Sequence, residues 1–82
     1  SQMLIIYYYN TRESRKTCFK VEEVSNACDV QEIQEALSAY LAIKDIIVYE
    51  WAIEKVTETW LMTTPYSEIE RHGTEVLRKE ND

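Results

Sequence analysis

The stretch "MLIIYYY", Met3–Tyr9, sets four aliphatic or thioether side chains beside three tyrosines in a chain of 82 residues. A short, continuous apolar run of this kind is typical of a strand with apolar neighbours on both of its faces. The run is far shorter than the roughly 20 residues that a membrane span requires. We therefore predict a central strand in a cytoplasmic protein, and this strand needs cover on two sides.

A second strand is predicted over residues 16–22, "KTCFKVE", where apolar and polar side chains alternate. The polar segment 10–15, "NTRESR", predicts the hairpin loop that joins it to the first strand. We expect Tyr9 to pair with Lys16. In that register Phe19 and Val21 share a face with Leu4, Ile6 and Tyr8, and the opposite face carries Ile5, Tyr7 and Tyr9.

A long amphipathic helix is predicted over residues 29–44, "DVQEIQEALSAYLAIK". Asp29 and Glu32 have the spacing of a capping box, in which the aspartate carboxylate accepts hydrogen bonds from amides of the first turn. The apolar stripe consists of Val30, Ile33, Leu37, Tyr40 and Leu41. We expect this stripe to cover one face of the sheet.

Two further strands are predicted over residues 45–51, "DIIVYEW", and 56–62, "VTETWLM", because both are dense in β-branched and aromatic residues. A turn within residues 52–55 would join them as a second hairpin. In this pairing Trp51 lies opposite Val56.

A short C-terminal helix is predicted within residues 63–73, "TTPYSEIERHG". Pro65 marks the break before it, and Gly73 can end it in a left-handed conformation. The tail, 74–82, is expected either to add a turn or to fray. Residues 1–2 precede the first methionine and are expected to be the remnant of a tag.

The predicted fold is a single α+β domain over residues 1–82, with a four-stranded antiparallel sheet, connectivity ββαββ and strand order 2-1-3-4. One long helix covers one face of this sheet, and the short C-terminal helix completes the chain. The other face, which carries Tyr7 and Tyr9, is then covered either by the C-terminal helix or by another molecule. Homodimerisation is one form of the second case.

The net charge of −6 is unevenly placed along the chain. Residues 10–20 carry a net +3, whereas residues 21–70 carry eleven acidic side chains against two lysines. Acidic bulk repels phosphates, so we expect no direct nucleic-acid binding; a basic protein surface is the complementary partner. The candidate contacts are Glu32, Glu35, Glu50, Glu54, Glu58, Tyr7 and Tyr9. The alternative is a solvated acidic surface that keeps a small protein soluble.

Catalytic and ligand-binding patterns have little support in this sequence. Cys18 and Cys28 are predicted to be free thiols, because two cysteines ten residues apart form neither a zinc ribbon nor a disulfide framework. His72 is the single histidine, and Ser67 lies too near it in sequence to form a nucleophile and base across a cleft. We therefore expect no enzyme, no metal and no cofactor.

In size, acidity and compact α+β plan, the chain resembles the small inhibitors that phages make against host defence or nucleic-acid enzymes, including anti-CRISPR proteins and DNA mimics. This is a resemblance of type and involves no shared motif. It implies a non-enzymatic module that occupies a basic nucleic-acid-binding site on a partner protein. The alternative is a structural or assembly protein that homodimerises through its exposed sheet face.

The predicted helix stripe leads to a stability test. Leu37→Ala should lower the free energy of unfolding by about 2–5 kcal/mol, because it removes a central side chain from the buried stripe. Urea denaturation of the full chain measures the change. A loss below about 1 kcal/mol would contradict the predicted burial of this helix face.

Overall fold

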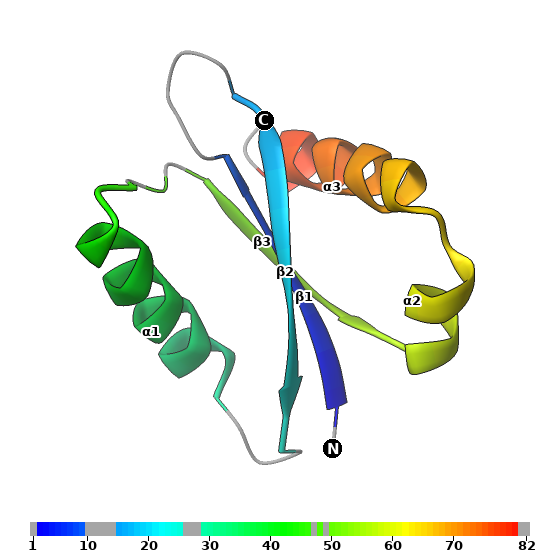
Figure 1. Ribbon diagram of the computed structural model, residues 1–82, viewed down its shortest axis with the longest axis horizontal. Helices are drawn as coiled ribbons and strands as arrows, with labels where there is room; N and C mark the ends of the chain where they lie inside the picture. The colour runs from blue at the N-terminus through cyan, green and yellow to red at the C-terminus, as the bar shows by residue number, and fades with distance from the viewer. Residues whose placement is uncertain (1, 10–14, 26–28, 47, 49, 81–82) are drawn as a thin grey trace.

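The computed structural model describes residues 2–9, 15–25, 29–46, 48 and 50–80 (Figure 1). The protein is α+β overall, as predicted, but the sheet has three strands. None of the helices in the described ranges is long and apolar enough to cross a membrane. The elements in chain order are β1 Gln2–Tyr9, β2 Thr17–Val24, α1 Val30–Ile43, β3 Trp51–Val56, α2 Glu58–Thr63 and α3 Tyr66–Glu80.

The sheet has the order β2-β1-β3, and both of its pairings are antiparallel. Figure 1 shows α1 on one face of this sheet and α3 on the other. β1 is therefore the central strand, as predicted, and lies at the centre of three layers. Its continuous apolar run follows from this position, since each of its two faces lies beneath a helix.

The predicted four-stranded sheet with order 2-1-3-4 is wrong. Residues 52–55, predicted as a turn, lie inside β3, and most of the predicted fourth strand, 56–62, forms α2. The hydroxyl of Thr57 accepts a hydrogen bond from the backbone N–H of Trp60 at 3.0 Å, and this cap begins the helix. Strand propensity depends on context, and this local hydrogen bond favours the helix.

The predicted third strand, 45–51, is also wrong over most of the positions that the structure describes. Ile46, Val48 and Glu50 lie outside any strand, and β3 begins at Trp51. The predicted positions 47 and 49 lie outside the described residues.

The register of the first hairpin differs from the prediction by one residue. Tyr9 pairs with Thr17 in place of Lys16, which puts Tyr7 opposite Phe19. A shift of one residue exchanges the two faces of a strand. Phe19 and Val21 therefore share the face of Ile5, Tyr7 and Tyr9. A polar loop predicts a hairpin but does not set its register, and the prediction failed for that reason.

The helix α1 has the predicted cap and part of the predicted stripe. The carboxylate of Asp29 accepts a hydrogen bond from the backbone N–H of Gln31 at 2.9 Å. Leu37 and Leu41 are each 5% exposed and form a cluster with Ile6 of β1. Other members of the stripe are less buried, since Val30 is 38% and Tyr40 is 47% exposed.

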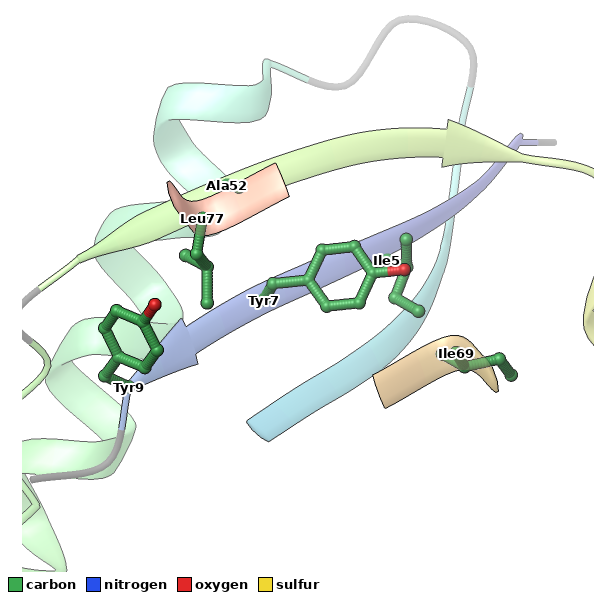
Figure 2. Close-up of a cluster of buried hydrophobic side chains, with 6 residues drawn as sticks. All are labelled: Ile5, Tyr7, Tyr9, Ala52, Ile69 and Leu77. Carbon is green, nitrogen blue, oxygen red and sulfur yellow. The ribbon is translucent and has the colours of Figure 1, made fainter. Parts of the chain in front are cut away.

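The opposite face of the sheet, which carries Tyr7 and Tyr9, lies beneath α3. Figure 2 shows the side chains that fill this layer, from β1, β3 and α3. The buried members are Ile5, Tyr7, Tyr9, Ala52, Ile69 and Leu77. Of the two kinds of cover considered, the structure has the intramolecular one.

Gly73 lies within α3 and does not end it, contrary to prediction. Ile69, Gly73 and Leu77 are buried at four-residue intervals and form the stripe that faces the sheet. The ring of Tyr7 packs so close that an ideal Cβ at Gly73 would lie 2.5 Å from its Cε1 atom. Glycine is required here for close approach, and its φ angle is negative.

Gly73→Ala should destabilise the fold by about 1–3 kcal/mol, because the added methyl group must displace the Tyr7 ring or the helix. Helix propensity alone would give the opposite sign, since Ala is favoured over Gly by about 1 kcal/mol inside a helix. Urea denaturation distinguishes the two. In a Tyr7→Leu background the penalty should shrink, and an equal penalty in both backgrounds would contradict the proposed clash.

Candidate functional site

The acidic candidates occupy different environments. Glu32 and Glu35 are exposed on α1, and Glu58 is exposed in the first turn of α2. Glu54 on β3 and Glu50 just before it are half-buried. Tyr7 and Tyr9 are 0% and 8% exposed beneath α3, and so are unavailable as direct contacts for a partner.

One end of the sheet gathers acidic side chains. Both outer strands run antiparallel to β1, so β2 and β3 end beside the start of β1, and α1 and α2 begin shortly after them (Figure 1). A hollow of about 370 Å³ at this end is lined by Gln2, Met3, Glu23, Lys55, Val56, Thr57 and Glu58. We call the exposed residues Glu23, Asp29, Glu32 and Glu58 the acidic end.

The acidic end was predicted only in part. Glu32 and Glu58 were predicted contacts, whereas Glu23 was not, and Asp29 was predicted only as the helix cap. The sequence placed Glu23 near the end of the second predicted strand. Only the order of the strands shows that this position lies beside the start of α2.

The carboxylate of Glu54 has a local partner. Its Oε1 atom lies 2.7 Å from Nε2 of His72 on α3, and both side chains are about one-third exposed. The His72 ring packs edge-on against Tyr7, with centroids 6.0 Å apart, and against Trp60 at 5.9 Å. These contacts tie β3, α2 and α3 together, so Glu54 has a structural role that spacing along the sequence did not predict.

A shallow pocket of about 730 Å³ lies beside this pair. Its lining is Glu54, Lys55, Val56, Thr57, Trp60, Thr64, Glu68, Arg71 and His72. Arg71 binds Glu68 at 2.8 Å and Glu75 at 2.7 Å, so its charge is already balanced. The lining also carries the hydroxyls of Thr64 and of Thr57, whose oxygen caps α2.

The hydroxyl of Tyr7 is buried without a hydrogen-bond partner among the described residues. Burial, with a smaller contribution from the Glu54 charge, raises the pKa of Tyr7 to about 12. The phenol therefore stays neutral at physiological pH.

The described part of the chain contains neither an activated thiol nor a cluster of metal ligands. Cys18 on β2 is half-buried and free, and burial raises the pKa of its thiol, which disfavours the reactive thiolate. Cys28 lies outside the described residues. Among the side chains that are described, no three of His, Cys, Asp or Glu lie together as metal ligands.

Comparison with protein-family models, with curated proteins and with solved structures gave no match. The positions of this chain's charged side chains and of its open sheet edges are therefore the features from which its function is inferred.

Tyr7→Phe should leave stability at neutral pH unchanged or raise it by up to about 1 kcal/mol, because it removes a buried hydroxyl that lacks a partner. The pH dependence should change as well. Between pH 10 and 12 the unfolded phenol loses its proton while the folded one keeps it, so wild-type stability falls as pH rises through this window. The variant should lack this part of the fall.

Urea denaturation at several pH values measures both effects of Tyr7→Phe. The matched control is Tyr66→Phe, which removes a hydroxyl from a ring that is 67% exposed. It should change the free energy of unfolding at neutral pH by no more than about 0.5 kcal/mol. A loss above about 1 kcal/mol in Tyr7→Phe would show that the hydroxyl has a partner.

Proposed function

We propose that this chain is a cytoplasmic, non-enzymatic protein-binding module whose acidic end binds a basic surface on a partner protein. The observation that carries the proposal is that exposed carboxylates lie around one end of the sheet. Glu23 and Glu58 line one hollow there together with Lys55, and Asp29 and Glu32 lie in the cap and first turn of α1, the helix that follows β2. They come from β2, from the cap of α1, from α1 itself and from α2. Helices, a strand and a helix cap hold their backbones in place. Binding should therefore cost little backbone entropy, and the side chains lose only their freedom of rotamer.

The charge pattern of α1 supports the same surface. From Asp29 to Ile43 the chain contains three acidic residues and neither lysine nor arginine. Glu32 and Glu35 are three residues apart and so neighbour one another on the helix. This closely spaced pair extends the acidic end along α1 and offers a partner negative charges on a fixed scaffold.

The basic surface we propose is a nucleic-acid-binding site, which would make the protein a competitive inhibitor. A net charge of −6 steers such a protein toward positive grooves and away from nucleic acid itself. Homodimerisation through an exposed sheet face, the alternative considered from the sequence, loses its basis because α3 covers that face.

The test is a double reversal, Glu32→Lys with Glu35→Lys, which changes the net charge from −6 to −2. Binding of the full chain to an immobilised arginine-rich peptide that itself binds duplex DNA is measured by surface plasmon resonance. The association rate should fall by about tenfold or more in the variant. Wild-type binding should weaken as the Debye length falls from about 10 to about 3 Å, and duplex DNA should compete for the peptide.

The matched control is Glu75→Lys with Glu80→Lys. It makes the same change in net charge, but both residues are exposed on α3, away from the acidic end. An acidic end that binds the peptide predicts a much smaller loss in the control. Equal losses in the two variants would mean that net charge alone acts, and binding without salt dependence would contradict the proposal.

A further inference from the structure

The strand β2 is a long open edge of the sheet. Within the described residues it pairs with β1 alone, along all eight of its positions. Unpaired N–H and C=O groups on an edge form a template for another strand. The other edge, β3, has six residues and carries Glu54, which is bound to His72. β2 is therefore the edge better suited to pairing.

The sequence of β2 is complementary to itself in the register centred on Val21. Two antiparallel copies related by a twofold axis must be centred on a residue that lies opposite its own copy. With Val21 at the centre, Lys20 of each copy lies opposite Glu22 of the other. Centring on Lys20 or on Glu22 would place like charges directly opposite, which is unfavourable. Centring on Phe19 also avoids like charges but pairs only residues 17–21 of β2, whereas centring on Val21 pairs residues 18–24.

The two charged side chains are arranged for this pairing on one face of the strand. In a single copy, Nζ of Lys20 lies 3.2 Å from Oε1 of Glu22, and both side chains are about 40% exposed. The dimer would bring the two exposed pairs, one from each copy, together as one cluster of four alternating charges.

Exposed tyrosines flank β2 in both helical layers. On the α1 side, Nζ of Lys20 lies 5.0 Å from the centroid of Tyr40, whose ring is part of a groove of about 330 Å³ between β2 and α1. On the α3 side, Tyr66 packs against Phe19 of β2 with centroids 5.0 Å apart. Tyr40 and Tyr66 are 47% and 67% exposed. A second copy at this edge would cover part of both rings.

We propose that two copies of this chain pair through β2, antiparallel and centred on Val21, to form one continuous six-stranded sheet. This interface does not depend on the proposed basic partner. Because the two β2 strands run in opposite directions, the two acidic ends lie at opposite ends of the dimer. Asp29, Glu32 and Glu58 lie outside β2, whereas Glu23 would lie opposite Phe19 of the other copy.

Sedimentation equilibrium of the full chain over a range of concentrations tests the dimer. Lys20→Glu alone and Glu22→Lys alone each set like charges opposite one another twice, and each should weaken dimerisation by about tenfold or more. The combined swap, Lys20→Glu with Glu22→Lys, should restore it. Lys55→Glu on the other edge strand is the matched control and should have little effect.

Mixing the two single variants is the sharper measurement. In a heterodimer of a Lys20→Glu chain with a Glu22→Lys chain, opposite charges face one another again at both positions. An equal mixture should therefore dimerise more tightly than either variant alone. Circular dichroism of each variant checks that the monomers remain folded.

A disulfide tests the register independently. In a background of Cys18→Ser and Cys28→Ser, Val21→Cys should form an intermolecular disulfide under mild oxidation, since the paired Cα atoms would lie about 4.5–5.5 Å apart. Glu23→Cys is the control, because its two copies would be offset by about 14 Å along the strands. A wild type that stays monomeric at all concentrations, a dimer unaffected by both charge variants, or equal cross-linking at the two positions would overturn the proposal.

Discussion

The contact between the ring of Tyr7 and the backbone of Gly73 is the constraint on which the rest of the structure depends. Since glycine has no side chain, α3 can approach β1 until the ring lies against the helix. Ile69 and Leu77, one turn to either side, then enter the same core. His72 precedes Gly73 in α3, so its ring packs edge-on against Tyr7 and its Nε2 atom contacts Glu54. The pocket beside this pair is thus a consequence of how closely the helix packs.

The two helical layers are unequal, although β1 contributes buried side chains to both. Beneath α3, six buried residues form one cluster with Tyr7 at 0% exposure. Beneath α1, the buried cluster contains Ile6, Leu37 and Leu41. The difference leaves α1 with more exposed apolar surface, including Ile43 at 83%. The larger buried cluster therefore lies beneath α3. Beneath α1, Leu37 and Leu41 are buried, while most other side chains of the helix are exposed.

Topology places the surfaces available to partners. Antiparallel pairing on both sides of β1 brings the ends of β2 and β3 together, and this gathers carboxylates that are far apart in the sequence. The same topology leaves β2 at an edge with alternating Lys20 and Glu22. The acidic end and the open edge thus belong to one sheet and meet on β2, where Glu23 follows Glu22.

The sequence by itself determined the central apolar strand, the α+β class and the acidic character. It also determined the Asp29 cap of α1 and the burial of Leu37 and Leu41. Each of these depends on residues that are neighbours along the chain. The tertiary structure alone decided the hairpin register, the conversion of residues 58–63 into a helix, the burial of Tyr7 and Tyr9 beneath α3, and the pairing of Glu54 with His72. Of the predicted contacts, Glu32, Glu35 and Glu58 are exposed and Glu54 is half-buried, whereas Glu23 became part of the acidic end through strand order. The reason is physical. Helical period and capping are local, but register and layer packing depend on contacts such as Tyr7 with Gly73, which lie far apart in sequence and which spacing does not encode.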